Sequence, residues 1–168
     1  MRTPRSKSRT SSSRKRLLAE SGHNVIGRCL CGGVRVTLPR PVHDVGVCHC
    51  RLCRAWTSGP WMALQVPDAV IDGDDLAIFR SSSFAERGFC PTCGSHIFHR
   101  PIGGPELAVS AGLFSDDSQF VAREIFVDSQ PSHYRFEGVN DRRTSTSMAL
   151  EWLPKLLARR VRSWFGRG

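Results

Sequence analysis

Seven cysteines are the residues best suited to chemistry in this 168-residue chain, and they fall in three short clusters. An odd number of cysteines at such close spacing is a poor basis for disulfides, because disulfide geometry restricts how near neighbours bridge. Thiolates at C-x-C and C-x2-C spacing are typical of zinc sites in a reducing compartment. The clustered residues are Cys29 and Cys31, then Cys48, Cys50 and Cys53, then Cys90 and Cys93.

The two outer clusters predict one closed metal site. Cys29 and Cys31 lie in "CLCGG", Cys90 and Cys93 lie in "CPTCG", and a glycine follows each pair. Glycine lets the backbone turn so that main-chain amides face the sulfurs. Two such turns supply four thiolates, which is the ligand number of a tetrahedral structural zinc site. The alternative, buried cysteines without a metal, does not explain why the paired spacing occurs twice.

The middle cluster, "CHCRLC", supplies three thiolates and predicts a different kind of site. Three protein ligands with one exchangeable position are the pattern of a catalytic zinc. A thiolate-rich zinc readily takes a fourth thiolate from a substrate, so Cys48, Cys50 and Cys53 are the candidate catalytic residues for activating a small thiol. His49 is a rival fourth ligand. Because it adjoins two ligands, it is expected to lie beside the site or at the surface instead.

Several side chains near the clusters have simpler interpretations. His96 and His99 are expected to be ordinary strand residues, and Trp56 and Trp61 are expected to belong to the core. Two arginines flank the middle cluster, and they either attract an anionic substrate or are solvated surface residues. These are Arg51 and Arg54.

Short runs of β-branched and aromatic residues between turn signals predict an all-β domain over residues 22–138. Residues 23–29 and 33–39 are expected to form a hairpin with the first cysteine pair at its tip. Residues 51–59 are expected to be a turn or a short helix. Further strands are predicted within 43–49, 60–67, 76–81, 85–90, 96–100, 106–114 and 123–130.

The positive charge of the chain gathers at its two ends. The formal net charge is +9, of which +6 lies in residues 1–20 and +4 in residues 151–168, while the part between them carries −1. Residues 1–21 are Ser- and Arg-rich without apolar periodicity, which predicts a disordered basic tail. That tail is either simply solvated, an arm for nucleic acid or anionic lipid, or an organellar targeting segment.

The C-terminal residues 148–168 predict a basic amphipathic helix, joined to the domain by a linker over 139–147. The helix either packs on its own domain or a partner, or lies on a membrane surface. Pro154 is acceptable in it only if the helix begins nearby. The apolar positions at helical spacing are Leu150, Leu153, Leu156, Leu157, Val161 and Trp164, opposite Lys155, Arg159 and Arg162.

The sequence carries no secretory apolar segment and no apolar run of the roughly 18 residues that a transmembrane helix needs. Together with the cysteine usage, this favours a cytoplasmic protein.

Three stretches, "GRCLCGGVRV", "CHCRLCRAWTSG" and "AERGFCPTCGSHIF", resemble the glutathione-dependent formaldehyde-activating enzyme family, which includes the centromere protein V group. The resemblance covers about residues 22–138 and all seven cysteines. It implies a small all-β zinc fold of the β-tent type. It also implies two zinc ions, one structural and one held by Cys48, Cys50 and Cys53. The chain departs from the common family ending at Ser132 and His133.

The resemblance implies a carbon–sulfur lyase activity in which formaldehyde and glutathione condense to S-(hydroxymethyl)glutathione. Zinc at the second site would bind the thiol of glutathione as its thiolate. The alternative is a non-catalytic scaffold in which both zinc ions are structural and the basic ends contact nucleic acid or a membrane surface. Salt-sensitive binding that disappears on deletion of either end would indicate this second function.

Overall fold

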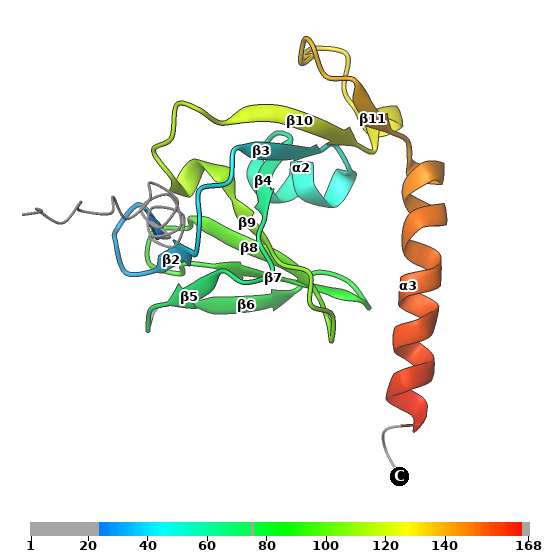
Figure 1. Cartoon of the computed structure of the whole chain (residues 1–168), viewed down its shortest axis with the longest axis horizontal. Helices are drawn as coiled ribbons and strands as arrows, with labels where there is room; N and C mark the ends of the chain where they lie inside the picture. Colours follow the sequence, from blue (N-terminus) through cyan, green and yellow to red (C-terminus); the bar gives the residue numbers. More distant parts are fainter. Residues whose placement is uncertain (1–23, 75, 166–168) are drawn as a thin grey trace, which may run out of the picture.

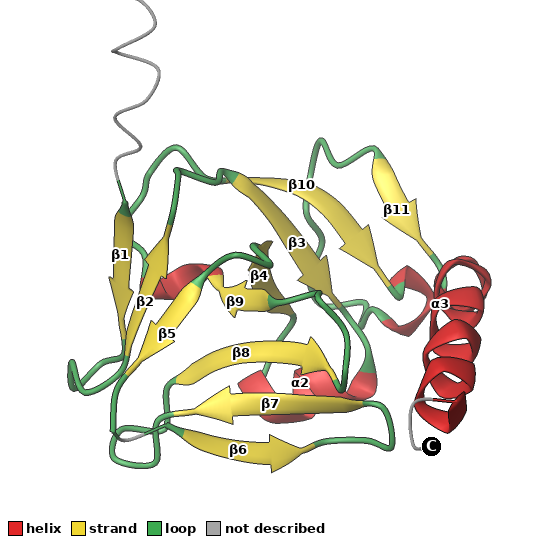
Figure 2. Ribbon diagram, turned by 60° about the horizontal axis from the view of Figure 1, so that its bottom comes forward, coloured by secondary structure: helices red, strands yellow, loops and turns green. Residues whose placement is uncertain are grey.

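The computed structural model describes residues 24–74 and 76–165, with side chains of the last helix described as far as Ala158. Its strands form two sheets, seen in Figure 1 and, from another side, in Figure 2. The smaller sheet is antiparallel and has the order β1 (Val25–Arg28), β2 (Arg35–Leu38), β5 (Val70–Asp72). The tail predicted over residues 1–21 lies outside the described residues.

Within the described residues the larger sheet has eight strands, and most of their pairings are antiparallel. β10 lies parallel to β3 on one side and to β11 on the other. The order of the strands across the sheet is β11 (Asp141–Arg143), β10 (Phe120–Ile125), β3 (Asp44–Cys48), β4 (Trp61–Gln65), β9 (Ala108–Ser110), β8 (His96–Pro101), β7 (Ala85–Phe89) and β6 (Ala77–Arg80).

The expectation of a mostly β structure with a C-terminal helix is confirmed, and every stretch predicted as a strand overlaps one, although β10 begins before the stretch 123–130 and ends within it. β1 and β2 form the predicted hairpin with the first cysteine pair at its tip. Two strands were not predicted, because neither has an apolar pattern. β5 is short and largely exposed, and β11 is the charged sequence Asp-Arg-Arg. An ion pair of 2.6 Å between Arg123 and Asp141 helps hold β11 beside β10.

Two α-helices and two short 3-10 helices accompany the described strands. The short α2 (Arg51–Thr57) forms where a turn or short helix was expected, and Cys50 caps its first turn. The 3-10 helices η1 (Ala111–Leu113) and η2 (Val127–Ser129) follow β9 and β10. The long α3 (Ser145–Phe165) stands at the edge of the domain in Figure 1.

α3 begins earlier than predicted, and the expected linker 139–147 contains β11 and the first turn of this helix. Two side-chain acceptors explain the early start: Asp128 accepts from the Ser145 amide at 2.8 Å, and Thr144 accepts from the Ser147 amide at 3.3 Å. Pro154 therefore lies inside the helix rather than near its start, and its missing N–H leaves one helical hydrogen bond unmade. No helix of the described part is long and apolar enough to cross a membrane.

The main core lies between the two sheets and includes one buried cysteine of each outer pair. Alternate residues of β2 and its approach point inward, as the two-residue period of a strand requires. The side chains of Val34, Val36, Val47, Ile97 and Phe98 are almost fully buried, and Cys29 and Cys90 belong to the same cluster. Cys48 and Cys53 belong to a second, smaller cluster with Trp61, Ala63 and Ala108.

Gly88 on β7 allows the closest packing in this core, because a Cβ there would lie 2.2 Å from the Phe98 ring. We therefore expect Gly88→Ala to lower the free energy of unfolding by about 1–3 kcal/mol, the usual cost of overpacking. Gly112→Ala is the matched control, since a Cβ at Gly112 meets nothing within 4 Å. Urea titration of both variants checks this, and equal stabilities would contradict the prediction.

Candidate metal centres

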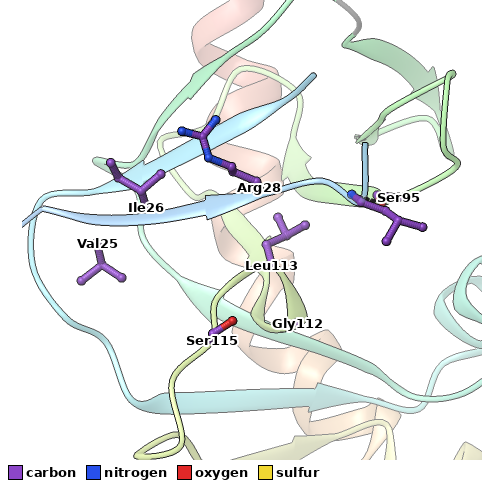
Figure 3. A pocket seen from close by; sticks show the side chains of 8 residues that line it. Val25, Ile26, Arg28, Ser95, Gly112, Leu113 and Ser115 are labelled. Atoms are coloured by element: carbon purple, nitrogen blue, oxygen red, sulfur yellow. Dashed lines mark hydrogen bonds between the residues drawn. The ribbon is translucent and has the colours of Figure 1, made fainter. Parts of the chain in front are cut away.

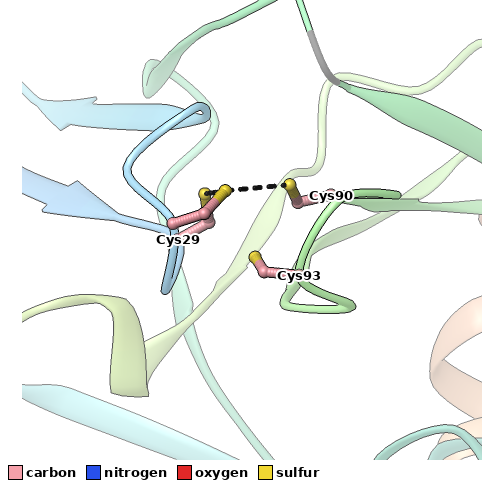
Figure 4. Close-up of side chains that lie close together, drawn as sticks. Cys29, Cys90 and Cys93 are labelled. Carbon is pink, nitrogen blue, oxygen red and sulfur yellow. Dashed lines mark hydrogen bonds between the residues drawn. The ribbon is translucent and has the colours of Figure 1, made fainter.

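The four outer cysteines meet at one point between two hairpins. Figure 4 shows Cys29, from the hairpin that joins β1 and β2, facing Cys90 and Cys93 from the turn between β7 and β8. All four sulfur atoms, including that of Cys31, lie within 4.8 Å of one another. The Sγ atoms of Cys29 and Cys31 are 3.5 Å apart, and those of Cys31 and Cys90 are 3.6 Å apart.

The two turns repeat one backbone design. The amides of Gly32 and Gly94 donate to the carbonyls of Cys29 and Cys90, at 2.9 Å and 2.8 Å. Both glycines have positive φ, of +80° and +73°, which a residue with a side chain adopts only with strain. The two turns are also joined directly, because the Leu30 amide donates to Ser95 Oγ at 3.1 Å. The backbone turn predicted at the glycine after each cysteine pair is therefore confirmed, although the amides of these two glycines face carbonyls and not sulfurs.

The donor set of this cluster fits a tetrahedral metal ion. Sulfur atoms about 2.3 Å from a zinc ion at tetrahedral angles lie about 3.8 Å apart, close to the observed sulfur separations. The Val34 amide donates to Cys29 Sγ at 3.1 Å, as expected for a sulfur that carries negative charge. A hydrogen bond to Ser95, at 3.2 Å between Sγ and Oγ, lowers the pKa of Cys93 to about 5. The thiolate form that zinc requires is therefore favoured at Cys29 and Cys93. At Cys31 a backbone hydrogen bond with Gly33 lowers the pKa, but hydrogen bonds with the other three cysteines outweigh it and raise the pKa to about 12.

The three middle cysteines converge at the junction of β3 and α2. Cys48 ends β3, Cys50 precedes the helix, and Cys53 lies in its first turn. Their sulfur atoms lie within 4.8 Å of one another, although the three residues are differently exposed. Hydrogen bonds with Cys48 and Cys53 lower the pKa of Cys50 to about 2, and the same interactions raise the pKa of Cys48. One thiolate thus forms readily in this group.

His49 is fully buried, and its ring supports the cysteine loop instead of joining the cluster. Its Nε2 lies 2.8 Å from Glu124 Oε2, and its Nδ1 lies 3.0 Å from the Tyr134 hydroxyl. Both ring nitrogens therefore have partners, and neither is left to bind a metal. Glu124 is also fully buried, and Arg142 Nε lies 3.3 Å from its second oxygen. Of the two expected positions for His49, the one beside the site is confirmed and the surface position is wrong.

The rings of Tyr134 and Phe136 pack against the His49 ring. The Tyr134 ring stacks on His49 with centroids 5.6 Å apart, and Phe136 lies 6.2 Å from the same ring. Sequence reasoning passed over Tyr134 and Glu124, since each follows the cysteine loop by more than seventy residues. The alternation of Tyr134 and Phe136, beside the departure at Ser132 and His133, is the signal that was available.

Arg87 is the second buried charge at the cluster and was not predicted. Its guanidinium is 2 % exposed and donates from Nη2 to Cys53 Sγ at 3.3 Å. It lies between the rings of Trp56 and Trp61, 5.8 Å from each centroid. Its Nη1 has no hydrogen-bond partner among the described residues. A buried donor without a partner is costly, so this position calls for a functional explanation.

A cleft of about 330 Å³ opens onto these three cysteines. Its walls include Trp61 and Arg87, the helix α3, and the loop between β6 and β7. His99 also lines it, whereas neither Arg51 nor Arg54 does. Arg54 Nε instead donates to the His49 carbonyl at 2.9 Å and so braces the loop. The cysteine cluster is thus reachable by a small molecule.

His96 and His99 lie on β8 and belong to neither cysteine cluster, as expected, but their environments are unusual. His96 packs against Trp61 with centroids 4.8 Å apart, and burial, with the nearby charge of Arg87, lowers its pKa to about 3. Burial and Arg87 likewise lower the pKa of His99 to about 4, so the histidine in the cleft is neutral at physiological pH. Trp61 is buried in the core as expected, yet it also lines the cleft.

A second hollow, of about 510 Å³, lies beside β1 and η1 (Figure 3). Val25, Ile26, Arg28, Leu113 and Ser115 contribute to its walls. It is lined by none of the seven cysteines, all of which are described. The candidate reactive residues therefore lie at the cleft that Cys48, Cys50 and Cys53 line.

Comparison with known proteins decides the family. Residues 24–129, well over half of the chain, match the family described as glutathione-dependent formaldehyde-activating enzyme. The chain belongs to the glutathione-dependent formaldehyde-activating enzyme family. An uncharacterized lyase of Schizosaccharomyces pombe is 31% identical to it over 115 residues, which cover 66% of this chain and 83% of that protein.

A crystal structure of a Rhodobacter sphaeroides protein is 21% identical, with a TM-score of 0.43, covering 71% of this chain and 99% of the other. The glutathione-dependent formaldehyde-activating enzyme match includes both cysteine clusters but ends before β11 and α3. The family resemblance seen in the sequence is therefore confirmed.

We expect the purified protein to carry two zinc ions, and each cluster to lose its own ion independently. Cys50→Ser should retain one zinc and remain folded, because its cluster lies at the edge of the core. Cys90→Ser should also retain one zinc, but it should be the less stable variant, since structural zinc sites contribute directly to folding. Native mass spectrometry and thermal unfolding measure both effects. Two ions in either variant would contradict this assignment.

His96 predicts a specific loss of stability in mild acid. The unfolded chain binds a proton at His96 below about pH 6.5, whereas the folded chain binds it only near pH 3, so stability falls as the pH drops through this window. Between pH 7 and 5.5 this amounts to about 1 kcal/mol. His96→Phe keeps an aromatic ring there and should lose this part of the pH dependence. Denaturant titration of both proteins at both pH values measures this. If the wild type and His96→Phe lose the same free energy of unfolding between pH 7 and 5.5, the prediction is wrong.

Proposed function

We propose that this protein is a zinc-dependent carbon–sulfur lyase that acts on the adduct of a small thiol, such as glutathione, and an aldehyde. The observation that carries this proposal is the convergence of Cys48, Cys50 and Cys53 on one point beside an open cleft. Membership of a family named for formaldehyde activation and a relative named as a lyase support an enzyme of the lyase type.

The contrast between the two cysteine clusters supports a division of roles. The outer cluster offers four sulfurs, which complete a tetrahedral zinc site and leave no position for a substrate. The middle cluster offers three, and the nearest imidazole, His49, is bound on both nitrogens by Glu124 and Tyr134. A fourth ligand is therefore not available from His49, and an incoming thiol can take that place.

The reaction proposed for this site is the addition of a thiol to a carbonyl group. Zinc bound by three thiolates would hold a substrate thiol as its thiolate at neutral pH. In the condensation direction, the sulfur lone pair forms the bond to the carbonyl carbon and the carbonyl π pair moves onto oxygen. The oxygen then takes up a proton equivalent to the one the thiol lost, so the reaction needs no oxidant or reductant.

Arg87 is placed to assist this step in two ways. Its hydrogen bond to Cys53 Sγ withdraws charge from a ligand sulfur, which leaves the metal a stronger acceptor for the substrate. Its Nη1, which is buried and has no partner among the described residues, is the donor that we assign to the oxygen that gains negative charge. The neutral His99 in the same cleft leaves Arg87 as the cationic donor among the residues that line it.

The scaffold alternative places its activity in the basic ends. The N-terminal one lies outside the described residues, as do the side chains of Arg159 and Arg162. A purely structural second zinc does not require an open cleft beside its ligands or a buried arginine with an unused donor. The enzyme hypothesis accounts for both.

The test follows formation of S-(hydroxymethyl)glutathione from formaldehyde and glutathione by NMR exchange, with native mass spectrometry as a control for folding and zinc content. We expect Cys53→Ser to abolish the catalysed rate while one zinc remains. Arg87→Lys keeps the charge but loses the planar fork, and should lower kcat by about 10²–10³-fold with zinc content unchanged. Wild-type rates in zinc-loaded Cys53→Ser would overturn the proposal.

A further inference from the structure

The helix α3 forms one wall of the cleft that leads to the three middle cysteines. Met148, Ala149, Trp152 and Leu156 line the cleft, and they recur at the spacing of one helix face. This wall lies beyond the family match, which ends at residue 129. The cysteines thus belong to the shared part of the chain, whereas part of the cleft in front of them comes from its C-terminal extension.

Specific contacts fix α3 in this position. Arg143 Nη1 bonds Glu151 Oε2 at 3.1 Å, and Asp128 caps the helix start through the Ser145 amide. Met148 is buried, with 8 % of its surface exposed, so the first turns of the helix pack firmly on the domain. The part of α3 that forms the cleft wall is therefore packed on the domain.

The cleft is strongly apolar for a site expected to receive glutathione. The charged residues that line it are Arg87 and Glu106, and Arg87 is already engaged with Cys53 and two tryptophan rings. Glutathione carries two carboxylates and an ammonium group, and burying these without partners is costly. Two apolar side chains at the cleft, Leu52 and Phe84, remain 48% and 45% exposed and would be covered by an apolar ligand.

We propose that the natural substrate carries an apolar alkyl or aryl group next to its carbon–sulfur bond, and that α3 recognises this group through Met148, Trp152 and Leu156. The inference rests on the proposed function for the reacting end of the substrate. The apolar group lies between α3 and the loop that carries Phe84, while any charged part of the substrate extends out of the cleft. The apolar group belongs either to the thiol or to the aldehyde.

The first test measures binding and does not depend on turnover. Zinc-loaded full-length protein is titrated by calorimetry with phenylmethanethiol and with 2-mercaptoethanol, which share the thiol but differ in apolar surface. If the apolar group is on the thiol, phenylmethanethiol should bind at least about tenfold more tightly. Trp152→Ala should reduce that preference about fivefold or more. Leu153→Ala is the matched control, because Leu153 is on the same helix but outside the cleft and 55% exposed.

Leu156→Ala serves as a second variant with a smaller change of volume, in case Trp152→Ala disturbs the helix. Circular dichroism reports helix content for all three variants. A preference that Trp152→Ala and Leu156→Ala both leave intact would overturn the role assigned to α3.

The second test places the apolar group on the aldehyde. Glutathione is held constant, and kcat/KM is compared for formaldehyde and phenylacetaldehyde, each corrected for the uncatalysed reaction. A relative gain for phenylacetaldehyde that Trp152→Ala removes and Leu153→Ala retains supports the proposal in this form. Absence of a preference in both the thiol and the aldehyde series overturns it. If no pair reacts, the lyase function itself fails, and the thiol titration alone then decides the inference.

Discussion

The buried hydrogen bond between His49 and Glu124 is the interaction on which the candidate site depends. Three sulfurs within six residues converge only if the side chains between them are held elsewhere, and His49 lies between two of the three. Its ring is anchored at 2.8 Å to Glu124 on the neighbouring strand β10. Because both groups are fully buried, removing either partner would leave the other with one remaining interaction, to Tyr134 for His49 or to Arg142 for Glu124. The cysteine loop is thus fixed by the sheet beneath it.

The two cysteine clusters differ in the number of sulfurs that they offer and in their surroundings. The outer cluster joins two hairpins whose cysteines are about sixty residues apart in sequence, and two of its four cysteines, Cys29 and Cys90, belong to the main core. The middle cluster lies in a smaller core of its own, next to the cleft. A rigid site with four ligands and an accessible site with three can therefore coexist, since the metal that would stabilise the fold is separate from the metal that would meet substrate.

Much of this was readable from the sequence because the interactions concerned are local. The short spacing keeps Cys48, Cys50 and Cys53 within six residues of one another, and Gly32 and Gly94 mark the turns that need positive φ. Period-two patterns gave the strands of the core, because alternate residues of a strand share a face. β5 and β11 escaped prediction because neither has an apolar pattern of its own. β5 is held by its pairing with β2, and β11 by its pairing with β10 and the ion pair between Arg123 and Asp141.

The sequence by itself thus determined the cysteines that could hold metal ions, their division into two groups, the family and the mostly β fold. Only the tertiary structure decided what surrounds the second group. Glu124, Tyr134 and Arg87 reach Cys53 and His49 from distant strands and loops, and α3 reaches the cleft through contacts that begin at Asp128. The spacing of these residues along the chain does not identify them as partners, because a hydrogen bond across the fold depends on where the sheets place two side chains.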